Sequence, residues 1–441
     1  MFVVKLIEKG FVVFSLVFFT GAITVILNGG TAPSPLQSNL ISKIIWYGIQ
    51  AATIVIVAAY RNRIIRIVIK EKLLWILIAL ALVSVLWSDQ PRATLGSNQN
   101  LICLTLFGVY FATRYSLKEQ LHLLAWALGI GAVLSLVFVI ALPSYGIMGR
   151  GSVITAETIS HAGTWQGIYG HKNVLARIMV LSTVVFLLFA TSSRKYCWLA
   201  WAGFCLSIGL ILGSTSKSSL IIVLTIMVVL PFYKALRWNY TIALPFFISA
   251  SLVGGSVAML LVDNAETILG TFGRDLTLTG RTDLWAAVFE KIWQRPWLGY
   301  GYGGFWRGLG GESADVWGVV RWEAPHSHNG FLDLWLDLGL LGLLTFALSF
   351  IILGLRAVAW VRQNKTAEGL WPLAYLTFLL LANLTESSLF RQNFLWVLYV
   401  AITISMHKIS DKVAETKAFS HHQLNREKMK RMMRGAKRGY S

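Results

Sequence analysis

The stretch QLHLLAWALGIGAVLSLVFVIAL, residues 120–142, contains no Lys, Arg, Asp or Glu and decides the fold class. About 20 predominantly apolar residues suffice for a helix that crosses the hydrocarbon core of a bilayer. Comparable runs recur along the 441 residues, of which 56% are hydrophobic and only 13% are charged. This composition excludes a cytosolic enzyme and a nucleic-acid-binding protein, and it predicts an all-α, polytopic integral membrane protein.

Windows of this kind predict about twelve transmembrane helices. They lie near residues 11–28, 42–59, 73–88, 100–113, 120–142, 173–191, 196–213, 218–233, 241–262, 330–355, 370–384 and 394–407. The first run is long and no small-x-small cleavage site follows it, so we interpret it as a retained span rather than a signal peptide.

The basic residues that give the net charge of +19 are distributed unevenly among the loops. Basic residues crowd the short loops of one side, which lie around residues 61–72, 114–118, 194–195, 234–237 and 356–365. The short loops of the other side hold only Lys43, Arg92, Lys217 and Arg391. The positive-inside rule therefore predicts that both termini are cytoplasmic.

The spans divide the chain into helical parts and loops. The predicted parts are helices in 1–142, an outer loop in 143–172, helices in 173–262, a large outer loop in 263–329, helices in 330–407 and a basic tail in 408–441. The tail is typical of a disordered cytoplasmic end attracted to anionic lipid. Function is expected to concentrate in the two outer loops.

The large outer loop contains two distinct patterns. Residues 281–293, RTDLWAAVFEKIW, carry apolar side chains at helical spacing and predict an amphipathic helix lying on the membrane or on the bundle. Residues 297–311, WLGYGYGGFWRGLGG, are rich in glycine and aromatic residues and predict a tight irregular loop.

Residues 325–342, PHSHNGFLDLWLDLGLLG, place two histidines where this loop enters a span. A helix beginning near Pro325 would carry one polar stripe facing the bundle interior, with His328 beside its mouth. The stripe consists of His326, Asn329, Asp333 and Asp337. Alternatively, the aspartates favour the helix dipole and the histidines lie at the wet interface.

Metal and disulfide sites are not predicted. Histidines at i and i+2 of a helix point apart, and no third ligand is evident beside His326 and His328. The 3 cysteines all lie in apolar stretches.

Several cations lie on the outer side against the positive-inside bias. This placement favours an anionic partner, although each could be an ordinary surface charge. They are Arg150, His171, Lys172, Arg177, Lys217 and Arg281. Lys217, within the hydroxyl-rich GSTSKSS turn, is suited to a phosphate or to a solvated helix cap.

His328-Asn329, followed after nine residues by Gly339-Leu-Leu-Gly342 and then Thr345, resembles the signature of the bacterial O-antigen ligase and polysaccharide polymerase superfamily. The segments GIYGHKN from Gly167, GRTDLW around Arg281 and RPWLGYG from Arg295 are similar to landmarks of its ExoQ-type polymerase branch. The resemblance covers roughly residues 163–345 and extends to the twelve-span layout.

The resemblance implies a membrane glycosyltransferase of the GT-C type that needs neither metal nor cofactor. Such an enzyme takes a glycan en bloc from undecaprenyl pyrophosphate at the periplasmic face of the bacterial inner membrane. The acceptor is another glycan or a lipid core, and the partners are the bilayer, a flippase and a chain-length regulator. We favour a repeat-unit polymerase over a ligase to the lipid A core, and either over a transporter of lipid-linked glycans or an inactive scaffold.

The resemblance also assigns residues. His328 matches the family's essential histidine, and Arg281 matches an arginine that binds the donor pyrophosphate. Where ligases carry further arginines, this chain offers Lys217 in one place and His171, Lys172 or Arg150 in the other.

Supporting roles complete these expectations. Asp333 or Glu323 would orient the catalytic histidine, beside His326 and Asn329. Four rings could stack on sugars or could instead be buried at the membrane interface. They are Tyr300, Tyr302, Phe305 and Trp306.

Overall fold

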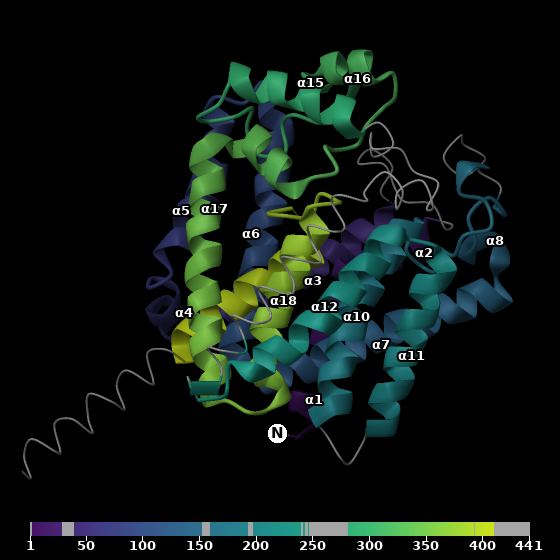
Figure 1. Cartoon of the computed structure of the whole chain (residues 1–441). Helices are drawn as coiled ribbons and strands as arrows, with labels where there is room; N and C mark the ends of the chain where they lie inside the picture. Colours follow the sequence, from purple (N-terminus) through teal and green to yellow (C-terminus); the bar gives the residue numbers. More distant parts are fainter. Residues whose placement is uncertain are drawn as a thin grey trace, which may run out of the picture.

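The computed structural model of the chain describes residues 2–28, 39–151, 159–192, 197–239, 241–242, 246, 281–391 and 393–409 (Figure 1). Within these residues the chain is helical, and its β structure is limited to an isolated antiparallel bridge between Ile147 and Trp165. Among them, 6 helices are long and apolar enough to cross a membrane, and shorter apolar helices accompany them. The prediction of an all-α, polytopic membrane protein is confirmed.

Most helices lie close to the predicted spans, but the first predicted span, 11–28, is divided between two helices, of which the first begins at Phe2. The long ones are α1 (Phe2–Phe19), α3 (Leu40–Ala59), α5 (Lys72–Val83), α6 (Pro91–Arg114), α7 (Leu117–Ala141), α10 (Lys172–Ser192), α11 (Cys197–Ser214), α12 (Lys217–Ala235), α17 (Gly330–Gln363), α18 (Ala367–Asn383) and the last described helix, Phe394–Ile409. The short ones are α2 (Ala22–Leu27), α4 (Arg61–Val68), α8 (Pro143–Gly146), α15 (Arg281–Gln294) and α16 (Ser313–Val320).

Other expectations fall outside the described residues. They are nearly all of the 241–262 span, the start of the large loop and the tail beyond residue 409. The count of twelve spans and the division of the chain into six parts therefore stay predictions.

Helix α6 begins at Pro91, well before the predicted start near residue 100. Its first turns contain Ser97 and Asn98, which lower the local hydropathy although both are buried inside the protein. The Asn98 amide donates a hydrogen bond to the carbonyl oxygen of Ala81 (2.9 Å). A hydropathy window misses such turns because it cannot distinguish polar groups satisfied by protein from polar groups exposed to lipid.

Ion pairs fix the direction of α6 in the bundle. Arg295 pairs with Asp89 just before α6 (2.8 Å), whereas Arg114 at its other end pairs with Glu8 in α1 (2.7 Å). The N-terminus and the helices α15 and α16 consequently lie at opposite ends of the molecule (Figure 1).

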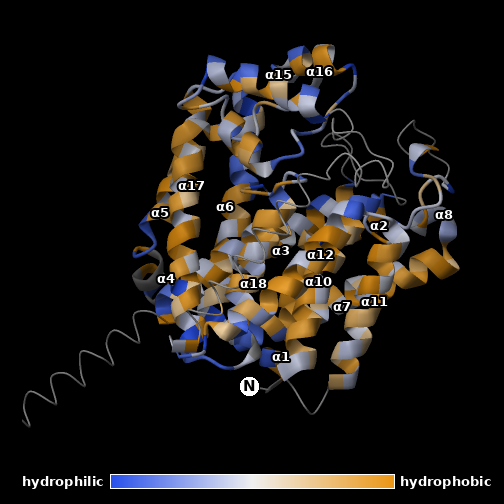
Figure 2. Ribbon diagram, viewed as in Figure 1, coloured by the Kyte–Doolittle hydropathy of each residue, from blue (hydrophilic) through white to orange (hydrophobic). Residues whose placement is uncertain are grey.

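Apolar side chains cover the flanks of the bundle, and polar residues gather toward its two ends (Figure 2). The flanks expose large residues such as Val55, Trp126 and Ile140. In a bilayer these side chains contact lipid, so their exposure carries no cost.

Helix α17 is interrupted at Gly339, whose φ is 66° and ψ is −171°. A Cβ atom there would overlap the backbone of Trp297, and an L residue rarely adopts this φ. The segment that follows Arg295 therefore lies against the interruption at a distance that only glycine allows.

This segment also satisfies the backbone groups that the interruption releases. The N–H of Leu340 donates to the carbonyl oxygen of Pro296 (2.7 Å), and the N–H of Tyr300 donates to that of Leu336 (2.8 Å). The indole of Trp335 donates to the same Pro296 oxygen (2.9 Å). The glycine- and aromatic-rich segment and the Gly339-containing motif therefore pack against each other and satisfy each other's backbone hydrogen bonds.

The predicted amphipathic helix is α15, and its apolar stripe packs on protein. Leu284, Val288 and Ile292 are buried in a small core with residues of α16 and α17. Phe289 and Trp293, at neighbouring positions of the same apolar stripe, remain exposed. Helices α15 and α16 cap the end of the bundle at which α17 begins (Figure 1).

We predict that Gly339→Ala destabilises the protein by about 2 kcal/mol, because the added methyl overlaps Trp297 and the backbone is strained. The measurement is the thermal unfolding midpoint in detergent, followed by tryptophan fluorescence. Gly354→Ala is the matched control, since an added Cβ meets nothing within 4 Å on the same helix. Equal unfolding midpoints for the two variants would contradict the inference that the segment after Arg295 packs tightly against Gly339.

Candidate active site

The histidine loop precedes α17, which begins at Gly330 and not near Pro325. Asn329 is its N-cap, and the side-chain oxygen accepts from the N–H groups of Phe331 (3.0 Å) and Leu332 (3.3 Å). Asparagine strongly favours this position because its side chain satisfies otherwise unpaired N–H groups. The expected polar stripe is therefore wrong for His326 and Asn329, which lie before the helix.

Ser327 anchors the loop between the two histidines. Its carbonyl oxygen accepts from the indole of Trp285 on α15 (2.9 Å), and its N–H donates to the Asp333 carboxylate (3.2 Å). The next residue, His328, has a φ of 54°, in the left-handed region that few non-glycine residues occupy. Backbone strain held in place by surrounding contacts is typical of functional positions.

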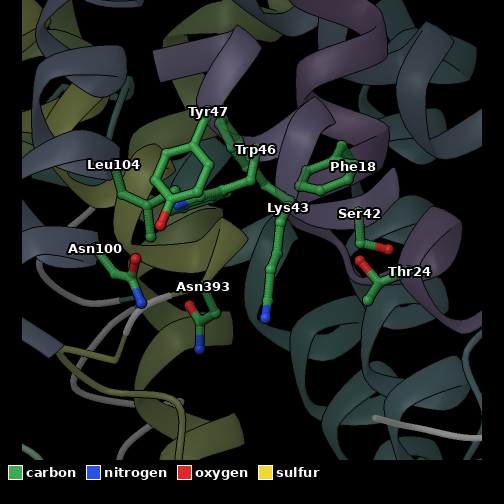
Figure 3. Close-up of a pocket in the computed structure, with 10 residues that line it drawn as sticks. Phe18, Thr24, Ser42, Lys43, Trp46, Tyr47, Asn100, Leu104 and Asn393 are labelled. Atoms are coloured by element: carbon green, nitrogen blue, oxygen red, sulfur yellow. The ribbon is translucent and has the colours of Figure 1, made fainter. Parts of the chain in front are cut away.

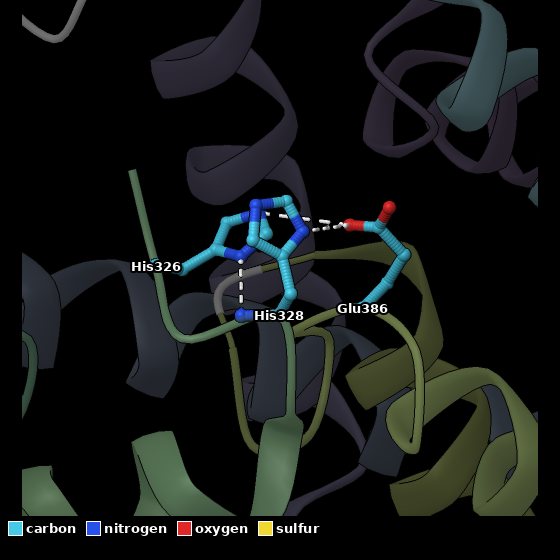
Figure 4. A group of neighbouring side chains, drawn as sticks. All are labelled: His326, His328 and Glu386. Atoms are coloured by element: carbon cyan, nitrogen blue, oxygen red, sulfur yellow. Dashed lines mark hydrogen bonds and ion pairs between the residues drawn. The ribbon is translucent and has the colours of Figure 1, made fainter. Parts of the chain in front are cut away.

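Both histidine rings converge on Glu386 (Figure 4). His326 Nε2 lies 3.7 Å and His328 Nδ1 lies 3.6 Å from Glu386 Oε2. The two ring centroids are 4.3 Å apart. The His328 N–H also donates to His326 Nδ1 (3.1 Å), which fixes the two residues relative to each other.

Glu386 joins this cluster to a third part of the chain. It lies in the connection between α18 and the last described helix, and its Oε1 accepts from the Asn173 amide on α10 (3.2 Å). The half-buried Arg177, one turn further along α10, acts on the same carboxylate electrostatically. Glu386 was missed from sequence, although a lone carboxylate in a short outer loop was a usable signal.

The charges of the cluster follow from its surroundings. Burial and the neighbouring His328 lower the pKa of His326 to about 4. Burial alone would raise the pKa of Glu386, but the adjacent His328 and His326 rings and the charge of Arg177 lower it to about 2. At neutral pH His326 is therefore neutral and Glu386 is ionised. A carboxylate facing His328 Nδ1 favours the proton on that nitrogen and leaves Nε2 able to accept one.

Asp333 has a different partner from the one expected. Its carboxylate contacts Arg391 (3.0 Å) and the indole of Trp306 (2.8 Å), in addition to the Ser327 N–H. Glu323 is exposed, and among the described residues it forms neither an ion pair nor a hydrogen bond with His328. The expectation that Asp333 or Glu323 orients His328 is corrected, because Glu386 occupies that position.

Arg391 ties the connection that carries Glu386 to α17. It lies 3.6 Å from Asp337 as well as 3.0 Å from Asp333. Burial alone would lower the pKa of the guanidinium, but the two carboxylates raise it above its usual value. One arginine thus joins two aspartates spaced one helical turn apart.

Most aromatic rings of the glycine-rich segment are buried inside the protein. Tyr300, Tyr302 and Phe305 are at most 2% exposed. The Tyr302 hydroxyl donates to the carbonyl oxygen of Phe390 (2.9 Å), beside the connection that holds Glu386. These rings are therefore structural, while the partly exposed Trp306 positions Asp333.

The expected donor-binding cations fall into two groups. Arg281 and Lys172 are the first residues of α15 and α10, the helices that supply Trp285 and Asn173 to the cluster. His171 precedes Lys172, and its Nδ1 accepts from the Asn173 N–H (3.1 Å).

The second group belongs to neighbouring turns. Lys217 begins α12, and Arg150 lies in the exposed turn after α8. These turns are joined through Trp165, whose N–H donates to the carbonyl oxygen of Gly213 (3.0 Å). The described residues that contact the histidine cluster belong instead to α10, α15 and α17.

The cluster also has the composition of a metal site. One ligand atom each from His326, His328 and Glu386 lies within 4.8 Å of the others. Both premises of the sequence argument against a metal are wrong, because the histidines are not on a helix and a third ligand is present. The absence of a metal stays a prediction that requires a direct test.

Comparison with known proteins identifies this region. A protein-family model described as O-antigen ligase matches residues 178–347. The chain is also 36% identical over 110 residues to the exopolysaccharide production protein ExoQ of Rhizobium meliloti strain 1021. That alignment spans 24% of this chain and 25% of the relative. Together with the motifs, these matches support the resemblance of the chain to the O-antigen ligase and polysaccharide polymerase superfamily.

Proposed function

We propose that this protein is a metal-independent glycosyltransferase of the GT-C type that transfers a glycan en bloc from undecaprenyl pyrophosphate. The acceptor is a further glycan, so the enzyme polymerises exopolysaccharide repeat units. The observation that carries the proposal is the pairing of His328 with Glu386 at the end of the bundle where the family motifs meet.

His328 is the proposed general base. As the acceptor hydroxyl oxygen bonds to the anomeric carbon, its proton passes to His328 Nε2, and the bond from that carbon to the pyrophosphate oxygen breaks. Glu386 holds the ring in the productive tautomer and stabilises the imidazolium that forms. His326, Asn329 and Asp333 keep the loop in place.

The leaving pyrophosphate gains negative charge, which cations at helix N-termini can stabilise. Arg281 and Lys172 are the first candidates because α15 contacts the histidine loop through Trp285 and α10 contacts Glu386 through Asn173. Arg177 joins them because it acts on Glu386 from α10. Lys217, His171 and Arg150 are assigned to the outer parts of the same donor.

The topology supports a periplasmic site in the inner membrane. The N-terminus lies at the end opposite α15, and Glu71 pairs there with Arg356, so basic loops share that end. The positive-inside rule makes it cytoplasmic. The outer loops at 143–172 and 263–329 then face the periplasm, where a flippase and a chain-length regulator would act with this enzyme.

Ligation to a lipid A core is the second candidate. The description O-antigen ligase of the matching family favours it. The similarity to an exopolysaccharide production protein favours polymerisation. Both use the same donor chemistry and differ in the acceptor.

We expect His328→Ala to abolish polymer formation, because the imidazole that accepts the proton is removed. Glu386→Gln should reduce polymer formation at least about 100-fold, because the carboxylate that orients this imidazole is lost. The assay is a glycan gel from cells that lack the native gene and carry each variant at equal membrane levels. Glu323→Gln is the matched control because that carboxylate is exposed.

Three outcomes of this assay separate the functions. Accumulated single repeat units on the lipid carrier support the polymerase. Intact polymer that never reaches the lipid core indicates ligation. Normal glycans from the His328→Ala strain would refute the catalytic role.

Arg281→Ala is expected to weaken donor use by about 2 kcal/mol, through loss of a charge-assisted contact to pyrophosphate. The readout is kcat/KM with purified enzyme and lipid-linked donor. Arg92→Ala removes an exposed charge from the same side and serves as the control. Identical kinetics in both variants would exclude Arg281 from the donor site.

Chelation tests the metal-free mechanism. Enzyme treated with EDTA and dialysed should retain full activity, because cations of the chain stabilise the leaving group. Metal content is measured in parallel by mass spectrometry. Activity that is lost on chelation and restored by a divalent ion would assign His326, His328 and Glu386 to a metal instead.

A further inference from the structure

A hollow of about 370 Å³ lies beside the connection that carries Glu386. Its lining residues come from α1, α2, α3 and α6 and from the connection that holds Asn393 (Figure 3). Its wall includes Phe18, Ser42, Lys43, Trp46, Asn100 and Asn393. This volume is within the range of small-ligand sites.

The lining of the hollow is amphipathic. The rings of Phe18 and Trp46 are stacked with centroids 6.3 Å apart, and Phe19 meets Trp46 edge-on at 5.8 Å. Lys43 is exposed and extends into the hollow, and no carboxylate is among the described residues that line it (Figure 3). An aromatic wall with a single cation suits a ligand that is apolar at one end and anionic at the other.

A buried polar group in the wall also points to a ligand. The Ser42 hydroxyl is buried, and within the described part of the chain its oxygen has no hydrogen-bond partner. Ser42 is adjacent to Lys43, so the hydroxyl and the ammonium could bind one anion together. Buried hydroxyls normally have a partner, and an unpaired one beside a cation is explained by a ligand that supplies it.

The hollow and the His326–His328–Glu386 cluster share one connection of the chain. The Asn393 amide donates to the carbonyl oxygen of Ser388 (3.4 Å), two residues after Glu386. The indole of Trp396 donates to Thr105 on α6 (2.9 Å). A single short connection therefore forms the wall of the hollow on one side and supplies Glu386 on the other.

From these observations, and resting on the proposed function, we propose that the hollow binds the phosphate-bearing head of the acceptor lipid. Polymerisation joins two glycans that are both lipid-linked, so the enzyme must bind a second isoprenoid phosphate beside the donor. Lys43 and Ser42 bind its phosphate, and Trp46 and Phe18 contact the first isoprene units. The exposed Ile44 and Tyr47 on α3 mark the side from which the lipid enters.

Direct binding tests this assignment. The purified full chain in nanodiscs is titrated with undecaprenyl phosphate and, separately, with the uncharged undecaprenol. Lys43→Gln should weaken binding of the phosphate about tenfold and leave the alcohol unchanged. Trp46→Ala should weaken both ligands. Lys365→Gln removes an exposed charge at the opposite end and should have no effect.

The source of the phosphate is resolved by competition. Excess phosphatidylglycerol or inorganic phosphate should displace the probe weakly; equal displacement by either would mean a general anionic surface and overturn the proposal. Equal affinity for phosphate and alcohol in the unmodified chain would overturn it as well. His328→Ala should still bind the probe. If it does while its glycans remain normal, the proposed catalysis fails and the lipid site stands.

Discussion

The interruption of α17 at Gly339 is the constraint on which the site depends. The Pro296–Tyr300 segment can approach the helix only where a side chain is absent, and it then binds the backbone groups that the interruption releases. Between Asn329 as N-cap and this fixed point there are nine residues, two and a half helical turns. The nine-residue spacing between Asn329 and Gly339 therefore sets the distance between the histidine loop and the interruption of α17.

Charge then connects this rigid segment to the rest of the bundle. Asp333 and Asp337 share one face of the short helical piece and meet Arg391, which lies a few residues after Glu386. Removing either partner would leave a buried charge without compensation, which is far more costly than the pair itself is stabilising. The same ion pairs that fix the connection also hold its carboxylate against the histidines, so structural and chemical roles cannot be separated here.

The sequence predicted the features that depend on local pattern. Span lengths located most helices, the apolar periodicity of α15 located the cap, and the histidine motif located the loop. It failed where the outcome depends on distant contacts. Glu386 is brought to His328 by packing of the last helices, and Asp333 turns to Arg391 instead of the histidine. The start of α17 was misplaced because one capping side chain, Asn329, outweighs an apparent helical stripe.

The position of Glu386 bears on how the protein is made. Ribosomes release the chain from the N-terminus, so the histidine loop and α17 leave the ribosome before the connection that carries Glu386 does. Asp333 and Asp337 therefore emerge before Arg391 is available to neutralise them. The nascent chain consequently passes through a stage in which His326 and His328 do not yet have Glu386 beside them. This cluster is completed only when the connection before the last described helix arrives.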